Sequence, residues 1–320
     1  MDDPEIPPTF QPHPEEFPDS VSLMEPSFIE RYGISPPLFA FLSLIIVFIL
    51  YQIVGGVMTF LLFGLAPNES NIEGYRVATA VGQMIFILLP TFVLVRFATS
   101  SPREFLRVRM PDIRTLLVPI VGIFSLQQML QIYLVFQERI PLPEPIEKAS
   151  QQFKELFEQV YTLLATSHTV PELLWVIVVL AVVPAIAEEF LFRGLVQRSL
   201  QQSMTPMRAA IFTGIIFGAY HLNPFSFVPL AVLGAYLGFL ALRADSIWSS
   251  SAAHFTNNAM ACIATYFHLD DDAIITGNPS QMSLATLLGT FWFFGVIFLL
   301  STFYYIKITQ PKEAAGTVEG

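Results

Sequence analysis

Charged residues are scarce in this chain of 320 residues. Asp, Glu, Lys and Arg make up 13% of it and hydrophobic residues 53%, with a mean hydropathy of +0.58. Soluble domains carry about 25% charged residues, so this composition excludes an ordinary soluble globular protein and predicts a chain that lies largely in lipid. Cysteine is rarer still. Cys262 alone excludes an internal disulfide framework and a cysteine-rich zinc site, and we expect it to be a buried packing residue rather than a nucleophile.

Basic residues are also few. The 16 Lys and Arg residues face 26 Asp and Glu residues, which gives a net charge of −10. Nucleic-acid binding needs basic patches, so no nucleic-acid partner is expected. Residues 1–37 contain nine prolines, eight acids and one base, and they lack the basic start and apolar core of a signal peptide. We predict that residues 1–37 are an acidic, proline-rich, disordered or extended cytosolic arm.

Long apolar runs begin after Pro37. A helix needs about 20 apolar residues to cross the hydrocarbon core. Eight segments are candidate spans: 38–65, 77–97, 114–136, 172–193, 207–222, 225–242, 246–267 and 284–308. No repeat is evident, and no large soluble domain fits between the runs. We therefore predict an all-α polytopic membrane protein of about eight transmembrane helices, with one multi-span domain over 38–310 and a cytosolic tail over 311–320.

The distribution of arginine and lysine predicts the orientation of these spans. With eight spans, twelve basic residues fall on one side of the membrane and four on the other. The twelve are Arg31, Arg96, Arg103, Arg107, Arg109, Arg114, Arg193, Arg198, Arg208, Arg243, Lys307 and Lys312, and the four are Arg76, Arg139, Lys148 and Lys154. The positive-inside rule puts the richer side, and with it both termini, in the cytoplasm. Asp270, Asp271 and Asp272 are then outside, and we expect an integral protein of the cell (inner or plasma) membrane.

The longest loop, about 137–171, falls on the outer side in this topology. Between about 145 and 165, apolar residues recur at helical spacing among Glu, Gln and Lys. We predict an amphipathic helix that lies on the bilayer surface or packs over the bundle. A structural cover is favoured over a substrate-handling element.

Ionisable residues inside a span are costly and indicate functional sites. The fourth span ends with Glu188-Glu189 and, four residues later, Arg193. Glu189 and Arg193 are spaced i,i+4, so they share a helix face and can pair, whereas Glu188 points about 100° away. We predict one carboxylate that is fixed by arginine and one that stays reactive. The alternative is an interfacial charge cluster at the end of a span.

Two later spans also carry polar side chains. His221 ends the fifth, and His254 and Asn258 share one face of the seventh. Each alone has a structural explanation, as a packed histidine or as helix–helix hydrogen bonding. At the helical rise, however, Glu188, His221 and His254 lie about 15, 21 and 12 Å from the cytoplasmic edge. We therefore predict that three helices converge on one pocket inside the bundle.

Such a pocket suits hydrolysis by activated water. A carboxylate and a histidine can hold a water and remove its proton, while a histidine and an asparagine can donate to the oxyanion that forms. Ser249, Ser250 and Ser251 precede His254, but they lack the strand–turn–helix setting of a nucleophile elbow. Serine catalysis therefore fits less well.

Three motifs in this part of the chain resemble those of the CPBP family. The family comprises the CAAX prenyl proteases and the bacteriocin-processing or immunity proteins, also called the abortive-infection family. The motifs are Glu188-Glu189-xxx-Arg193, Phe217-xxx-His221 and His254-xxx-Asn258, in this order and each on a predicted membrane helix. The resemblance covers about 170–270, which we take as the catalytic core. The first three spans and the acidic arm are outside it.

The resemblance implies a glutamic-type intramembrane endopeptidase, a peptide hydrolase. Glu188 would be the general base that activates water, assisted by His221. His254 and Asn258 would form the oxyanion hole, and the remaining pair of the first motif would position these groups. The implied catalytic residues are Glu188, Glu189, Arg193, His221, His254 and Asn258.

The expected substrate is a membrane-embedded or membrane-anchored peptide or protein, CAAX-like or other. No cofactor is expected. Two histidines on different helices and a carboxylate could also ligate zinc, so a metalloprotease mechanism is the minority alternative. Other readings are a non-catalytic membrane scaffold or bacteriocin-immunity-type protein of the same fold, and, less favoured, a proton-coupled transporter, whose internal repeats we do not see.

Overall fold

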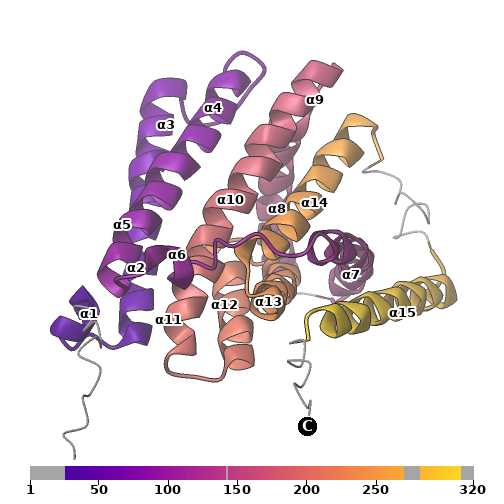
Figure 1. The fold of residues 1–320 in the computed structure, drawn as a ribbon. Coiled ribbons are helices and arrows are strands. Elements are labelled where there is room, and N and C mark those ends of the chain that lie inside the picture. Colours follow the sequence, from indigo (N-terminus) through magenta and orange to yellow (C-terminus); the bar gives the residue numbers. More distant parts are fainter. Residues whose placement is uncertain (1–25, 142, 270–281, 311–320) are drawn as a thin grey trace, which may run out of the picture.

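The structure is a computed structural model that describes residues 26–141, 143–269 and 282–310. These residues form helices and no strand (Figure 1), which confirms the all-α prediction. Each of the eight predicted apolar segments is helical. Within the described residues, six helices are long and apolar enough to cross a membrane: Pro36–Phe63, Ile72–Ala98, Arg114–Glu138, Val170–Gln201, Phe227–Ala244 and Leu284–Ile308. The chain is therefore a polytopic membrane protein.

The count of eight spans is not confirmed. α12 (Pro206–Tyr220) has 15 residues, which is short for a crossing. α14 (Ile247–Tyr266) carries several Ser, Thr, Asn and His residues among its 20, so its mean hydropathy is low. His221 follows directly after α12, and α14 carries His254 and Asn258, two of the polar residues that lower its apolar signal.

Three of the spans contain π-helical segments. The first consists of α2 (Pro36–Phe48), η1 (Ile49–Gly55) and α3 (Gly56–Phe63), and the second of α4 (Ile72–Gln83), η2 (Met84–Leu88) and α5 (Leu89–Ala98). The fourth consists of α9 (Val170–Ile177), η3 (Val178–Val182), α10 (Val183–Glu189), η4 (Phe190–Val196) and α11 (Gln197–Gln201). π-Helical turns are frequent at functional sites.

The ribbons of α12 and α13 (Phe227–Ala244) lie side by side (Figure 1). The two helices pack closely because glycines face each other. A Cβ on Gly214 would overlap the backbone nitrogen of Ala235, and a Cβ on Gly234 would lie 2.9 Å from the Cα of Gly214. Small residues let membrane helices approach to backbone contact. The approach fixes the C-terminal end of α12 against α13, and His221 follows directly after that end.

A buried aromatic and aliphatic cluster supports the fourth span. It lies where α2, α5, η4 and α12 meet and includes Val47, Val95, Leu191, Phe192 and Phe217. The rings of Phe192 and Phe217 meet edge to face, with centroids 5.1 Å apart. This packing holds the chain that follows Glu189 in one orientation. Cys262 is fully buried beside Leu173 and Val176 in a smaller cluster, as predicted.

The predicted amphipathic segment is α8 (Glu144–Ala165), which follows α7 (Arg114–Glu138) in the chain. Its side chains Phe153, Leu156 and Phe157 are exposed. Its C-terminal end is fixed by Arg76 of α4, whose side chain is 1% exposed. The Arg76 guanidinium donates to the carbonyls of Leu164, at 3.0 Å, and Thr166, and pairs with Glu73 and, at 2.9 Å, Glu172. The last helix of the described residues is α15 (Leu284–Ile308).

The N-terminal arm differs from its prediction where it is described. Residues Phe28–Arg31 form the short helix α1, in which the Ser27 amide donates to the Glu30 carboxylate at 2.7 Å. Ile29 is buried, and the ring of Phe28 packs on Phe97 of α5. This part of the arm is folded, because its two apolar side chains have a surface to bury against. Residues 1–25, Asp270 to Asp272 and the tail 311–320 are outside the described residues.

Candidate active site

Glu188 and Glu189 occupy the last turn of α10, between the π-helical segments η3 and η4. The side chain of Glu189 is fully buried, whereas that of Glu188 is 15% exposed. Adjacent residues on a helix point about 100° apart. The two carboxylates therefore face different surroundings, as the sequence predicted.

Glu189 is held by two partners. Its Oε1 accepts from Arg193 Nη1 at 2.7 Å and from His254 Nδ1 at 3.0 Å. Arg193 is itself fully buried and donates through Nη2 to the carbonyl of Gly234 at 2.9 Å. The i,i+4 pair predicted from sequence is thus present, and it joins α10, η4, α13 and α14. A buried ion pair of this kind needs such additional hydrogen bonds to offset desolvation.

Glu188 faces both histidines. Its Oε2 lies 4.0 Å from Nε2 of His221 and 3.9 Å from Nε2 of His254. These separations are too long for direct hydrogen bonds, and Oε2 has no hydrogen-bond partner within the described part of the chain. The three side chains thus surround a space in which a water can bond to a carboxylate oxygen and an imidazole nitrogen.

The hydrogen bonds of the histidines define their tautomers. Nδ1 of His221 lies 2.7 Å from the carbonyl of Phe217, and a carbonyl only accepts, so Nδ1 carries the proton. In the neutral ring, Nε2 is then an acceptor that faces Glu188. His254 donates through Nδ1 to Glu189 by the same reasoning, so its Nε2 donates only when the ring is an imidazolium.

Phe217 supports three of the charged or titratable side chains. Its ring centroid lies 4.6 Å from that of His221 and 5.8 Å from that of His254. The guanidinium of Arg193 lies over the same ring at 4.8 Å, a cation–π contact. One aromatic residue of α12 thus sets the spacing between groups from three helices.

Asn258 is separate from the other five residues. Its amide nitrogen donates to the carbonyl of Leu180 at 3.1 Å, and its oxygen accepts from Asn257 at 3.1 Å. Leu180 belongs to η3. One amide N–H of Asn258 is therefore committed to the fourth span, and the second is available to another acceptor.

No group of three or more His, Cys, Asp and Glu side chains in residues 26–141, 143–269 and 282–310 is arranged to hold a metal ion. Of the three serines before His254, two have hydroxyls that donate to backbone carbonyls, whereas Ser251 Oγ has no hydrogen-bond partner among the described residues. Ser249 donates to the carbonyl of Thr115 at 2.7 Å and Ser250 to that of Ile247 at 2.9 Å. Both serines therefore serve to hold the start of α14.

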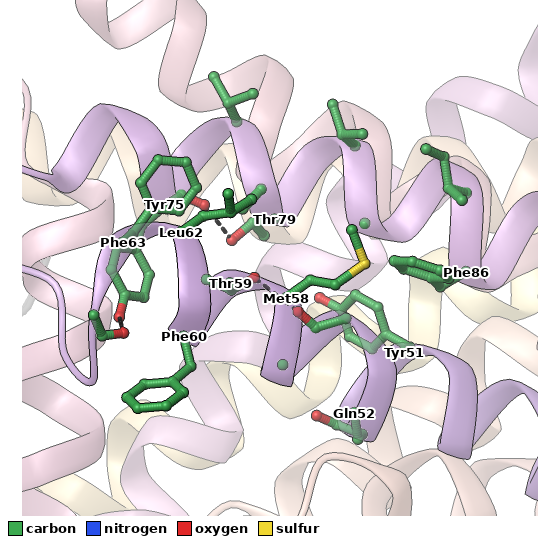
Figure 2. Close-up of a pocket in the computed structure, with 18 of the residues that line it drawn as sticks. Tyr51, Gln52, Met58, Thr59, Phe60, Leu62, Phe63, Tyr75, Thr79 and Phe86 are labelled. Carbon is green, nitrogen blue, oxygen red and sulfur yellow. Dashed lines mark hydrogen bonds between the residues drawn. The ribbon is translucent and has the colours of Figure 1, made fainter.

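A groove lies beside the site, between the first two spans. It has a volume of about 430 Å³ and mainly apolar walls. Figure 2 shows the rings of Tyr51 and Phe86 at one end and those of Phe63 and Tyr75 at the other. Tyr51 and Phe63 are separated by twelve residues, or about 18 Å at the helical rise. The groove is thus long and narrow, and its walls come from η1, α3, α4 and η2.

Tyr51 connects this groove to the site. Its side chain lies close to Gln83 and close enough to Glu188 for the two to interact electrostatically. Neither Tyr51 nor the groove was predicted from the sequence. The available signal is the pair Tyr51-Gln52 within a mainly apolar first span, together with Gln83 in the second.

One part of the chain matches a known protein family. Residues 170–260 match the family described as Type II CAAX prenyl endopeptidase Rce1-like. The match includes all six predicted site residues, and it confirms the resemblance that the three motifs indicated. Comparison with curated proteins and with solved structures finds no match.

Proposed function

We propose, from the Rce1-like match over residues 170–260 and the geometry around Glu188, that this protein is an intramembrane endopeptidase of the glutamic type. It hydrolyses a peptide bond in a membrane-anchored substrate. The observation that carries the proposal is that one poorly exposed carboxylate, Glu188, faces His221 and His254 at 4.0 and 3.9 Å without a direct hydrogen bond.

Water is the nucleophile in this proposal. A water between Glu188 and His221 is at hydrogen-bonding distance of both when each bond is about 2.8 Å. Glu188 takes one proton as the hydroxide oxygen attacks the carbonyl carbon of the substrate. The tetrahedral intermediate then collapses, and the proton passes to the leaving amine. The products are a carboxylic acid and an amine, so the atoms of one water are consumed.

His254 and Asn258 stabilise the oxyanion. Asn258 supplies its second amide N–H, and His254 supplies its Nε2–H in the imidazolium form. Glu189 accepts from the opposite nitrogen of His254 at 3.0 Å and so orients the His254 ring, and Arg193 holds Glu189. Glu189 and Arg193 are therefore positioning residues that act through His254. Removal of one oxyanion donor typically lowers the rate by about 10²–10³.

The substrate combines a peptide with a hydrophobic anchor. The groove between the first two spans suits a hydrocarbon chain, because its walls are mainly apolar, and pockets of about 300–1,000 Å³ hold small ligands. Its Tyr51 end is close to Glu188, so an anchor in the groove would bring the attached peptide to the water. A CAAX-like peptide with a lipid-modified cysteine has this form.

We also propose a location and an orientation in the membrane for this protein. It lies in the cell membrane with both termini in the cytoplasm, which is supported by the distribution of Lys and Arg between the two sides. The acidic arm solubilises the N-terminus, and α8 covers the bundle on the outer side. No cofactor takes part in the reaction.

Cleavage of a quenched, lipid-anchored peptide by the purified full-length protein tests this function. We expect Glu188→Gln to lower the rate by about 10²–10⁴, because the general base is lost while the volume is kept. Glu155→Gln, on the exposed face of α8, is the matched control and should cleave at the wild-type rate. Equal rates for wild type and Glu188→Gln would contradict the proposal and favour a non-catalytic scaffold.

A chelator separates the two water-activating mechanisms. We expect the rate to be unchanged by 1,10-phenanthroline, because the carboxylate and the histidines activate water directly. A rate that falls with the chelator and returns with added Zn²⁺ would replace this mechanism with the metalloprotease alternative.

A further inference from the structure

Three arginines gather at one end of the bundle, away from the candidate active site. Arg107 and Arg109 lie in the segment between α6 (Pro102–Phe105) and α7, and Arg198 lies on α11. One carboxylate serves two of them. Asp245 forms an ion pair with both: its Oδ1 lies 3.0 Å from Arg107 Nε, and its Oδ2 lies 3.0 Å from Arg109 Nη2. Three guanidinium groups and one carboxylate leave an excess of positive charge.

The same cluster has an excess of hydrogen-bond donors. Arg107 Nη2 and Arg198 Nη1 both donate to Gln201 Oε1, at 2.7 and 3.1 Å. This double contact sets the Gln201 amide with its nitrogen turned away, and that nitrogen has no partner among the described residues. Arg107 is 5% exposed, and its Nη1 also has no partner there. Buried donors without acceptors are costly, so the cluster lacks an acceptor.

Electrostatics agree with this geometry. The pKa of Arg107 is lowered to about 10, first by burial and then by the nearby charge of Arg198, with Arg109 acting in the same direction and Asp245 opposing it. A bound anion would oppose both causes, because it compensates the buried charge.

The location of the cluster indicates where the anion comes from. Gln201 is the last residue of one candidate span, and Asp245 directly follows the last residue of another, Ala244. The ends of spans lie at the depth of the lipid headgroups. Arg109 has an exposed side chain and opens the cluster to that layer.

We propose that Arg107, Arg109, Arg198 and Gln201 form a phosphate-binding site that takes the headgroup of an anionic bilayer lipid. Guanidinium groups match the tetrahedral oxygens of phosphate through paired N–H donors. Basic pockets between membrane helices bind such headgroups.

Binding would brace the start of α14. Arg107 accepts the amide of Ile247 at 3.2 Å, and Arg109 accepts the hydroxyl of Ser246 at 2.7 Å, both on backbone carbonyls. A phosphate that holds the two arginine side chains therefore also steadies the turn before α14. Thermal stability is for this reason a readout of occupancy that does not depend on catalysis.

The test is lipid binding by the full-length protein in detergent, measured by native mass spectrometry with phosphatidylglycerol and with phosphatidylcholine. We expect wild type to prefer phosphatidylglycerol, and Arg198→Gln and Arg107→Gln each to bind it about five-fold more weakly. Arg243→Gln is the matched control. Its guanidinium donates to Thr309 and to the carbonyl of Ile306, so its loss should leave phosphatidylglycerol binding unchanged.

A second experiment distinguishes a lipid headgroup from free phosphate as the bound anion. Thermal midpoints are compared in phosphatidylglycerol and in inorganic phosphate, each against chloride at equal ionic strength. Stabilisation of wild type but not Arg198→Gln by the lipid alone supports the lipid site, and the same pattern with inorganic phosphate assigns the site to free phosphate instead. The proposal would be overturned if Arg243→Gln weakened phosphatidylglycerol binding as much as Arg198→Gln does. It would also be overturned if the wild type bound phosphatidylglycerol no more tightly than phosphatidylcholine. Arg198→Gln decides the question if Arg107→Gln fails to fold.

Discussion

Two neighbouring carboxylates have different environments in this protein. Glu189 is fully buried and bonded to Arg193 and His254. Glu188 is partly exposed, and its Oε2, which has no hydrogen-bond partner among the described residues, faces two histidines. The difference arises because a helix turns about 100° per residue, so only one of the two can share a face with Arg193. Glu189 and Glu188 are adjacent in the chain, yet one is a positioning residue and the other is the proposed base.

This difference predicts unlike effects on stability. Removal of one partner from a buried ion pair leaves an uncompensated buried charge and costs about 3–5 kcal/mol. We therefore expect Arg193→Ala to lower the free energy of unfolding by this amount and the thermal midpoint with it, as measured by a fluorescence melt of purified protein. Lys148→Ala is the control, because its pair with Glu144 is exposed and contributes little. A melt of Arg193→Ala that overlays the wild type would show that Glu189 does not depend on this pair.

Glycines determine how closely two of the helices, α12 and α13, pack. Gly214 and Gly234 let α12 and α13 come into backbone contact, and this contact sets both the end of α12, where His221 lies, and the Gly234 carbonyl that holds Arg193. The π-helical segments η3 and η4 flank the turn that carries Glu188. The candidate site therefore depends on two irregular features of the helices rather than on an ideal bundle.

Separation of α12 from α13 should disable the site. We expect Gly214→Ala to destabilise the protein by about 1–3 kcal/mol and to reduce peptide cleavage more than tenfold, because its Cβ would overlap the backbone of α13. Gly289→Ala on α15 is the control, since a Cβ there meets nothing within 4 Å. The readouts are thermal midpoint and cleavage rate. Wild-type values for Gly214→Ala would contradict the role assigned to this contact.

At the scale of the whole molecule, the first two spans supply a groove and the later spans supply the polar site. Tyr51 belongs to the groove and lies within electrostatic reach of Glu188. The Rce1-like match covers residues 170–260 and therefore does not include the groove. We accordingly expect the matched part to determine the chemistry and the first two spans to determine which anchor is accepted.

A side chain added inside the groove should alter anchor recognition alone. Gly82 lines the groove, and a Cβ there would lie 3.6 Å from the Tyr51 ring, an ordinary contact. We expect Gly82→Leu to raise KM about tenfold for a lipid-anchored peptide, because displacing about two methylenes from the groove loses roughly 1.6 kcal/mol of burial. The kcat/KM for the same peptide without its anchor should not change, and Gly289→Leu should match wild type for both. A similar loss for both peptides would indicate a distorted site rather than a filled groove.

Features that depend on neighbours along the chain could be predicted from the amino-acid sequence. Apolar runs predicted the helical segments, and the i,i+4 spacing predicted the bond between Glu189 and Arg193. Helical periodicity predicted α8, and burial of Cys262 followed from its apolar surroundings. The arm was predicted less well, because the burial of Ile29 against the bundle is not a local property.

The distances between groups on different helices could not be predicted from the sequence, because they depend on how the helices pack. The motifs indicated that Glu188, His221 and His254 converge, but their separations of 4.0 and 3.9 Å follow from the close contact of α12 with α13 and from the packing around Phe217. The groove at Tyr51 and the unpartnered donors of Arg107 likewise arise where distant segments meet. Hydrophobic periodicity specifies which face of a helix is buried, whereas the depth and distance of contact between faces depend on side-chain shapes that meet only in the folded chain.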